Sequence, residues 1–373
     1  MEVDAPRPGI VIGMPRIRPE IESLVRYSPG LPIEEVAREY GIADIVKLAS
    51  NENPLPPFPE VSAAMAEIVS GVNRYPDSGC FELTKALSGA TGIAGESLWF
   101  GAGSSELLTA VARAVGGEGT SVVFGWPSFA MYPINAALGG SEPIQVPLDS
   151  RHRYDLDRMA GAIRSDTTLV FLCNPNNPTG TYRAASDVRA FVEGISDDTL
   201  VVLDEAYAEY VVADDYESGI PLALARPNVI VARTFSKMYG LAGLRVGYMI
   251  GYPDTIGSLR RAQIPFSVNS LAQIAAITSL GYPDRVVERV KVNRQGIAFL
   301  EQELDVRGIE WVPSQANFVW MRLGPDNAAL CQALMERGVI VRPLSDEWAR
   351  VSIGTDSENR RFFSALDGVL AKS

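Results

Sequence analysis

Short apolar runs alternate with stretches of helical spacing between residues 97 and 251, and this alternation most restricts the fold. The runs are apolar throughout rather than at every second position, which is typical of strands buried on both faces of a sheet. Helices between such strands cover both faces of the sheet. The pattern predicts an α/β fold with a mostly parallel, seven-stranded sheet, whose strands lie at 98–100, 122–124, 144–146, 169–173, 200–203, 229–232 and 246–250.

Glycine-rich or polar motifs follow five of these runs. Ligands of parallel sheets bind beyond the carboxyl ends of the strands. We therefore expect five motifs to meet in one crevice, at 103–105, 126–129, 174–180, 204–207 and 236–237.

The sequence changes in character on either side of the alternating region. A chain of 373 residues exceeds one average domain. Residues 1–30 are rich in proline, and beyond Pro265 helical stretches alternate with short, turn-rich apolar runs. We predict an N-terminal arm with part of a small domain at 1–45, a large cofactor-binding domain at 46–265 and a smaller α+β domain at 266–373.

Composition excludes several classes of partner. The formal net charge of −12 argues against nucleic acid, whose phosphates would be repelled. Three scattered cysteines without a CxxC pair suggest neither a disulfide framework nor a zinc site. We see no secretory signal and no apolar run of about 20 residues. The expectation is a cytoplasmic protein without metal or membrane.

The sequence contains a single histidine, His152, in a charged turn. Histidine is the usual proton carrier near neutral pH. Its scarcity disfavours Ser-His-Asp hydrolysis, histidine metal sites and histidine-based dehydrogenation. Acid–base chemistry in this chain must therefore use lysine, tyrosine or carboxylate.

Lys237 follows a buried strand in the stretch from Val229 to Tyr248, and Arg245 lies eight residues later. A partly desolvated lysine is a nucleophile for an aldehyde, and a nearby guanidinium binds a phosphate dianion. Ser236 and Arg245 are predicted to hold a phosphate while Lys237 reaches the aldehyde of pyridoxal phosphate. The simpler alternative is a surface lysine in a loop.

Gly103, Ser104 and Ser105 follow a strand and open a helix. Free backbone N–H groups and the helix dipole make such a turn an anion site, and glycine permits close approach. Glu106 occupies the third glycine position of a dinucleotide fingerprint, which weakens a nicotinamide-binding interpretation.

Two further loops offer groups for a flat ring. Phe129 is predicted to stack on it. An asparagine amide in the run 174–180 is predicted to hold a ring oxygen, and the Asn177–Pro178 bond to be cis. An aromatic residue in such a loop is otherwise a core residue.

Asp204 ends an apolar run and precedes Tyr207 by three residues. A carboxylate at the end of a buried strand needs a cationic partner. A protonated pyridine nitrogen is such a partner, and its protonation makes the ring an electron sink. Tyr207 is predicted to hydrogen-bond the phenolic oxygen of the ring. The alternative is an aspartate that caps a helix.

Arg342 and Arg350 each lie beside an apolar run in the C-terminal region. The planar guanidinium suits a substrate carboxylate or phosphate. Asn317 is predicted to assist them. Two surface arginines are the alternative.

The assembled motifs resemble the histidinol-phosphate aminotransferase family of fold-type I pyridoxal-phosphate enzymes. SNENP, RYPD, CNPNNPTG, DEAYAEY, RTFSKMYGLAGLRVGY and SQANFVW occur in the family's order over nearly the whole chain. The resemblance implies a transaminase with an amino donor and a 2-oxo acid acceptor. It also implies a homodimer with shared active sites, in which Tyr75 reaches the phosphate of the partner subunit.

The resemblance assigns the same roles to the residues. Lys237 bonds to the cofactor, Asp204 pairs with the pyridine nitrogen, and Asn177 and Tyr207 hold the ring oxygen. Phe129 stacks on the ring, residues 103–105 with Ser236 and Arg245 bind the phosphate, and Arg350 with Arg342 binds the acidic end of the substrate. Ser105 and Phe129 stand where many relatives carry aspartate and tyrosine.

The substrate stays open between histidinol phosphate and the aromatic amino acids phenylalanine and tyrosine. The run from Tyr75 to Cys80 and the residues around Trp126 and Phe129 look more like the aromatic amino acid aminotransferase branch. A pyridoxal-phosphate lyase or decarboxylase is the alternative reaction. A non-catalytic regulatory protein on the same fold is disfavoured, because no basic helix-turn-helix segment is visible.

Overall fold

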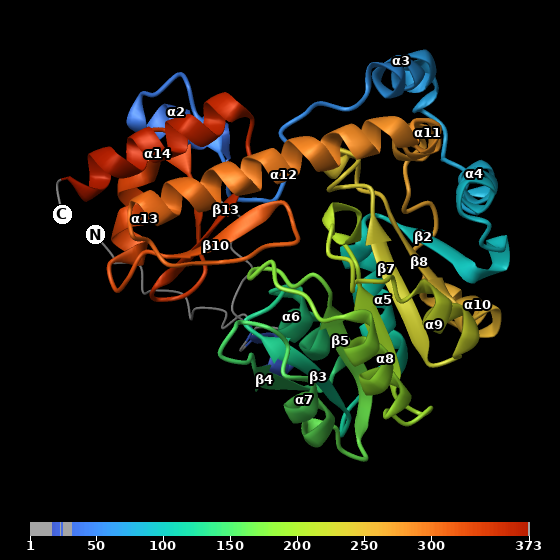
Figure 1. The fold of residues 1–373 in the computed structure, drawn as a ribbon. Helices are drawn as coiled ribbons and strands as arrows, with labels where there is room; N and C mark the ends of the chain where they lie inside the picture. The colour runs from blue at the N-terminus through green and yellow to red at the C-terminus, as the bar shows by residue number, and fades with distance from the viewer. Residues whose placement is uncertain (1–16, 23, 25–31, 372–373) are drawn as a thin grey trace, which may run out of the picture.

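A seven-stranded sheet forms the centre of the larger part of the molecule in the computed structural model, which describes residues 17–22, 24 and 32–371 (Figure 1). β8 pairs antiparallel with β2 and β7, and the other pairs are parallel. The predicted α/β fold is thus confirmed. In spatial order the strands are β2 (Leu98–Gly101), β8 (Gly247–Gly251), β7 (Val229–Thr234), β6 (Leu200–Asp204), β5 (Thr167–Cys173), β3 (Ser121–Trp126) and β4 (Glu142–Pro147).

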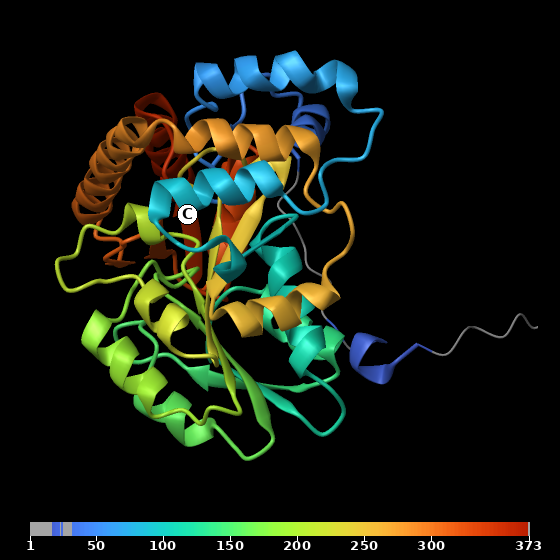
Figure 2. The ribbon, with the colours of Figure 1, turned by 90° about the vertical axis from the view of Figure 1, so that its right-hand side faces the viewer.

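Helices cover both faces of this sheet, as Figure 2 shows, with α5 and α10 on one face and α8 and α9 on the other. α11 packs against α3 and α4 beyond the edge formed by β2. The helices around the sheet are α3 (Pro59–Ile68), α4 (Phe81–Thr91), α5 (Ser104–Val115), α6 (Met131–Gly139), α7 (Leu156–Ala162), α8 (Ala185–Glu193), α9 (Ile220–Ala225), α10 (Pro253–Leu259) and α11 (Ser270–Leu280).

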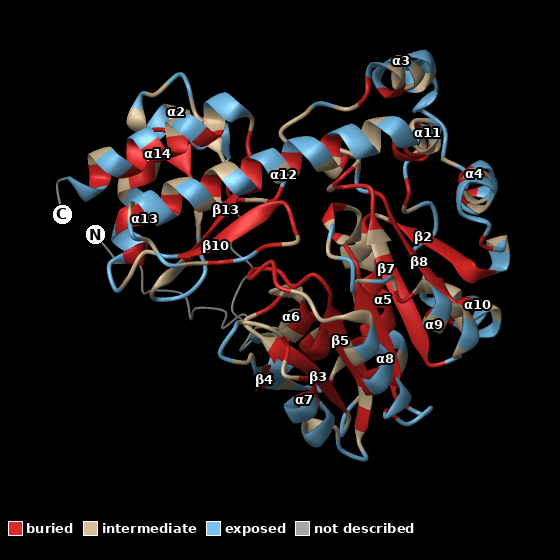
Figure 3. Cartoon of the chain, viewed as in Figure 1, coloured by how far each residue is buried: buried red, intermediate tan, exposed pale blue. Residues whose placement is uncertain are grey.

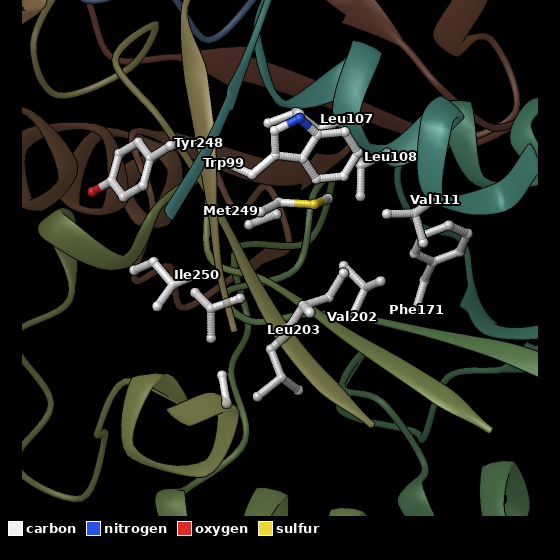
Figure 4. Close-up of a cluster of buried hydrophobic side chains, with 14 of the residues drawn as sticks. Trp99, Leu107, Leu108, Val111, Phe171, Val202, Leu203, Tyr248, Met249 and Ile250 are labelled. Atoms are coloured by element: carbon white, nitrogen blue, oxygen red, sulfur yellow. The ribbon is translucent and has the colours of Figure 1, made fainter. Parts of the chain in front are cut away.

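The main core lies between the sheet and α5. Leu107, Leu108 and Val111 recur at helical spacing, so they share the face of α5 that meets Trp99 of β2 and Met249 of β8 (Figure 4). Each of these side chains is at most 1% exposed. Burial of one such side chain contributes about 1.5–3 kcal/mol. This packing fixes the strand ends that carry the site.

A second core belongs to the C-terminal part, where a four-stranded sheet has the order β12-β13-β10-β9. α12 runs between this part and α11, as Figure 1 shows, and its Leu300 and Leu304 are buried in the second core. The elements are α12 (Pro283–Val306), β9 (Trp311–Val312), β10 (Phe318–Arg322), α13 (Asn327–Met335), β11 (Val339–Ile340), β12 (Arg342–Pro343), β13 (Trp348–Ser352) and α14 (Asp356–Leu370). α14 begins with a capping box between Thr355 and Glu358.

The described N-terminal elements join both parts. α1 (Pro19–Glu22) lies beside α6, where Arg18 donates to the carbonyls of Ala137 and Leu138. α2 (Ile33–Tyr40) ends at Gly41, which lies in the left-handed region. β1 (Val46–Lys47) pairs with β11. Residues 1–16, 23 and 25–31 of the region predicted as an arm with part of a small domain at 1–45 lie outside the described residues.

Burial follows the same division. Figure 3 shows most strands of both sheets buried, the edge strands β4 and β12 largely accessible, and the outward faces of α3, α4 and α12 exposed. The domain boundary at residue 265 stays a prediction. Beyond it, Ala272, Ala275 and Ala276 of α11 still pack in the core of the seven-stranded sheet. Among the described helices, none is long and apolar enough to cross a membrane.

Candidate active site

A cavity of about 300 Å³ lies at the carboxyl ends of the parallel strands. The strand-end rule therefore located it correctly. Residues from the turns after β2, β3, β5, β6 and β7 line it, and β12 and β13 of the smaller sheet contribute arginines. The lining side chains used below are Ser104, Ser105, Phe129, Asn177, Asp204, Tyr207, Ser236, Lys237, Arg245, Arg342 and Arg350.

Lys237 projects into this cavity from the turn after β7. The turn is fixed locally, because the Ser236 N–H donates to Thr234 Oγ1 over 3.0 Å. Lys237 Nζ donates to the carbonyl of Ser50 over 3.2 Å and lies 5.8 Å from the centre of the Tyr207 ring. Burial, and then the Arg350 guanidinium, lower the pKa of the Lys237 amine to about 8. A useful fraction of the amine is therefore neutral near physiological pH.

Asp204 ends β6 and is 2% exposed. Each carboxylate oxygen has one donor: Oδ2 accepts from the Tyr132 hydroxyl over 2.8 Å, and Oδ1 accepts from the Ala206 N–H over 3.2 Å. Burial raises the pKa of Asp204 to about 6, and the hydrogen bond from Tyr132 opposes this rise. The carboxylate has room for one more donor from the cavity, and a cationic N–H group fits that need best.

Tyr132 is a site residue that the sequence analysis missed. Its ring stacks on Phe171 at 4.6 Å and an interplanar angle of 9°, and its hydroxyl meets Asp204. The one available signal was its position three residues after Phe129 at the start of α6, which places both rings on one side of that turn.

Gly103, Gly247 and Arg245 form a closely packed anion cradle at the start of α5. Gly103 has a φ of +79°, and a Cβ there would lie 2.5 Å from Arg245 Nη2. A Cβ on Gly247 would lie 2.4 Å from the Ser104 nitrogen. The glycines thus bring the guanidinium against the N-terminus of α5, where free N–H groups and the helix dipole favour a dianion. Ser105 and Ser236 line the same end of the cavity.

Three predicted ring contacts line the cavity as well. Phe129 lies edge-on to Tyr132, with 5.7 Å between ring centres. Asn177 Oδ1 accepts from Arg350 Nη1, so its amide nitrogen is available to the cavity. The predicted cis bond between Asn177 and Pro178 is confirmed. The Tyr207 oxygen accepts from Asn51 Nδ2 over 2.9 Å, and burial raises the pKa of Tyr207, which keeps its hydroxyl protonated.

Arg350 and Arg342 reach the cavity from the smaller sheet. Arg350 is buried and donates to the Ala49 carbonyl over 2.6 Å and to Asn177. The structure does not bring two other predicted residues to the cavity wall. Asn317 donates to the Asn51 carbonyl over 3.1 Å, and Tyr75 lies on the surface with 82% exposure.

The residues present fit pyridoxal phosphate. The cradle of Gly103, Ser104 and Arg245 suits its phosphate, the Asp204 carboxylate suits its ring nitrogen, and a partly neutral Lys237 suits its aldehyde. No cluster of side chains that could hold a metal ion occurs in the described part of the chain.

Comparison with known proteins gives one consistent result. Residues 43–366 match the family model for aminotransferase class I and II. The histidinol-phosphate aminotransferase of Moorella thermoacetica is 42% identical over 97% of this chain and 95% of its own. The aromatic amino acid aminotransferase of Mycobacteroides abscessus is 43% identical over 93% of this chain and 97% of its own.

A solved structure extends this result to the cofactor. The histidinol-phosphate aminotransferase from Sinorhizobium meliloti in complex with pyridoxal 5′-phosphate aligns with a TM-score of 0.88 and 29% identity, over 97% of this chain and 99% of that one. Since the family model spans most of the chain, the protein belongs to the class I and II aminotransferases and is a pyridoxal-phosphate-dependent aminotransferase.

Proposed function

We propose that the enzyme moves the amino group of an aromatic amino acid to 2-oxoglutarate. The observation that carries this choice of donor is a second cavity of about 630 Å³ that adjoins the first. The two cavities share Phe129, Asn177, Arg342 and Arg350 as lining residues. A substrate held at Arg350 therefore has its side chain directed into this second cavity.

The walls of the second cavity are mainly apolar. Trp126 and Phe129 form one part, Pro133 and Ile134 of α6 another, and Leu344 closes it from the C-terminal part. Apolar and aromatic walls bind a phenyl or phenol ring through dispersion and the release of water. Glu20 and Gln145 also line this cavity and offer acceptors for a phenol hydroxyl.

Histidinol phosphate is the second candidate donor. It is favoured by Arg342 beside Arg350, since two guanidinium groups suit a phosphate dianion. Desolvating a phosphate among Trp126, Ile134 and Leu344 would be costly without further cations, and Glu20 adds a like charge. We therefore rank the aromatic donor first.

Steady-state kinetics with several amino donors and 2-oxoglutarate as the acceptor tests whether the aromatic donor is preferred to histidinol phosphate. We expect kcat/KM for phenylalanine or tyrosine to exceed that for histidinol phosphate by at least about 10-fold. Ile134→Ala should lower kcat/KM for phenylalanine by about 10-fold, because it removes packing from the cavity wall, whereas Val287→Ala on the exposed side of α12 should change nothing. A larger kcat/KM for histidinol phosphate would reverse the assignment.

The residues of the first cavity would bind different parts of the cofactor. Pyridoxal phosphate, when bound, supplies an electron sink that stabilises negative charge at the substrate α-carbon. We propose that Gly103, Ser104, Ser105, Ser236 and Arg245 hold its phosphate. Asp204 keeps its ring nitrogen protonated, Asn177 and Tyr207 bind its phenolic oxygen, and Phe129 stacks on its face.

Lys237 has two roles in this proposal. Its amine would hold the cofactor by its aldehyde in the resting enzyme. Displaced by the amino group of the donor, Lys237 Nζ would take the proton from the α-carbon of the donor in one half-reaction and give a proton to the α-carbon of the acceptor in the other. A pKa of about 8 suits both directions, because the amine can accept and release a proton near neutral pH.

The arginines bind the carboxylates. Arg350 is preorganised by its bonds to Ala49 and Asn177, and we propose that it holds the α-carboxylate of both substrates. Arg342 then receives the second carboxylate of 2-oxoglutarate. Asn317 assists the arginines indirectly, because its hydrogen bond to the Asn51 carbonyl holds the segment that leads from Ala49.

We also propose that the enzyme is a homodimer. The rings of Tyr75 and Phe266 stack on the surface with 4.6 Å between their centres. Phe81 is a third exposed aromatic residue, with 78% of its surface accessible. Large aromatic side chains left on the surface of one chain mark a protein interface. In the dimer, Tyr75 would reach the phosphate in the partner subunit.

Sedimentation tests the assembly. The wild type should sediment at twice the 40.3 kDa mass of one chain. Phe266→Glu should shift the equilibrium to monomer and weaken cofactor affinity, because Tyr75 is withdrawn, whereas Val306→Glu at the exposed end of α12 should not. A wild-type monomer with full affinity for the cofactor would contradict the proposal.

The buried cysteines bear on the cellular location. Cys80, Cys173 and Cys331 are buried free thiols, which suits the reducing cytoplasm. We propose a cytoplasmic enzyme with an N-terminal arm and part of the small domain at 1–45, the large domain at 46–265 and the rest of the small domain at 266–373.

A further inference from the structure

Asn51 lies in a short extended segment between the two cores, on no helix or strand, and is 1% exposed. Its φ is +53°, in the left-handed region that asparagine and aspartate tolerate better than other side chains. A buried asparagine held in this region places its amide with little freedom. Its contacts therefore indicate what the position is for.

Three hydrogen bonds connect Asn51 to Ser352 and Tyr207. The Asn51 backbone N–H donates to Ser352 Oγ over 2.8 Å, and the Ser352 hydroxyl donates to Asn51 Oδ1 over 3.1 Å. Asn51 Nδ2 then donates to the Tyr207 oxygen over 2.9 Å. All three residues are buried, so each bond is formed away from competing water.

These bonds fix which way the Asn51 amide faces. Ser352 Oγ accepts from the Asn51 N–H and donates its own proton to Asn51 Oδ1. The NH₂ group on the other side of the amide faces Tyr207. The Tyr207 oxygen accepts from it, so the hydroxyl proton points elsewhere, and the described residues offer it no acceptor.

We propose that Asn51 is a positioning residue that fixes the Tyr207 hydroxyl as a hydrogen-bond donor into the cavity, with Ser352 of β13 setting the direction of the Asn51 amide. The inference rests on the proposed contact between Tyr207 and the phenolic oxygen of the cofactor. That oxygen carries negative charge and needs a donor. With the amide reversed, the tyrosine would give its proton to Asn51 instead.

The pH titration of the visible absorbance of the cofactor-loaded protein provides the test. When the bound cofactor loses a proton at high pH, its phenolic oxygen becomes more negative. The hydrogen bond from Tyr207 is stronger to this deprotonated form than to the protonated one. Its loss in Tyr207→Phe should therefore move the midpoint upward by about one to two pH units. The charged groups around the cavity stay the same in every variant: Glu52, Asp204, Lys237, Arg245, Arg342 and Arg350.

Asn51→Asp separates the hydrogen bond from the added charge. Aspartate has the same shape and tolerates the same φ, but its carboxylate only accepts, so it takes the Tyr207 proton away from the cavity. Its charge also raises the midpoint directly. We expect Asn51→Asp to raise the midpoint by about one pH unit more in the wild type than in the Tyr207→Phe background, where only the charge effect remains.

The outcomes separate the two claims. Equal shifts of Asn51→Asp in both backgrounds would overturn the positioning role and leave the Tyr207 contact standing. An unchanged midpoint in Tyr207→Phe would overturn the Tyr207 contact and, with it, the role of Asn51.

Ser352→Ala tests the hydrogen bond between Ser352 and Asn51 without adding a charge. This variant releases Asn51 Oδ1, so the midpoint should move upward, but by less than in Asn51→Asp. Thermal unfolding followed by circular dichroism verifies that each variant is folded. Ser279→Ala removes a similarly buried hydroxyl from α11, where it bonds the Ala275 carbonyl, and should leave the midpoint unchanged. A midpoint in Ser352→Ala equal to the wild type would contradict the role given to Ser352.

Discussion

Replacing Lys237 with alanine should lower the rate of transamination by at least about 10⁴-fold. The change removes both the amine that bonds to the cofactor and the group that moves the α-proton. Two of the remaining groups in the cavity, Tyr207 and Asp204, are poorly suited to replace it. Burial holds the pKa of Tyr207 well above its usual value, and Asp204 is occupied by Tyr132 and Ala206.

Steady-state kinetics and the visible absorbance of the loaded protein measure this effect. Lys291→Ala on the exposed side of α12 is the matched control and should behave as the wild type. The Lys237→Ala variant should still bind the phosphate end of the cofactor, because the cradle of Gly103 and Arg245 is unchanged. Turnover within 10-fold of the wild type would refute the role of Lys237 as base.

Asp204→Asn should reduce turnover by about 10³-fold while the cofactor remains bound to Lys237. Asparagine nearly matches aspartate in shape but carries no charge to keep the ring nitrogen protonated. The electron sink is then lost while the amine and the cradle are intact. Rapid-reaction kinetics should locate the loss in the proton-transfer step, and a variant with normal turnover would show that the ring nitrogen has another partner.

The same variant should gain stability in the absence of cofactor. The pKa of Asp204 in the folded state is about 6, above the ordinary value of 3.8. The stabilising contribution of its protonated form is thus complete at about pH 3, below the unfolded pKa, and is lost as the pH rises through 6. At pH 8, Asp204→Asn should raise the free energy of unfolding by about 3 kcal/mol, and at about pH 3 the difference should vanish. Urea unfolding at both pH values measures it, and an equal difference at the two pH values would contradict the account.

The fold was predictable because its signal is local and repeated. All seven strands of the large sheet were predicted, since six are apolar runs of buried residues and the edge strand β4 keeps the apolar Ile144 and Val146. The shortest helices around the sheet give a weaker signal. α9 and α10 span six and seven residues and each carries a proline in its first turn, so their spacing gives few periods to recognise. The antiparallel direction of β8 is set by the turn that carries Lys237. The spacing of apolar residues contains no information on the direction of a strand.

The cavity was predictable for a different reason. Parallel strands end at one edge, so residues at strand ends, such as Asp204 and Lys237, meet without any knowledge of packing. Tyr132 and Asn51 lie within a helix and an irregular segment, and only tertiary contacts give them a role. Long-range pairs of this kind, such as Asn51 with Ser352, leave no spacing in a single sequence.

The central claim is that one amine, Lys237 Nζ, bonds to the cofactor. Borohydride reduction of the loaded enzyme, followed by proteolysis and mass spectrometry of the peptides, tests it most directly. The account predicts that the reduced cofactor is found on Lys237 and on no other lysine. A label on another residue, or a fully loaded enzyme that takes up no label, would contradict it.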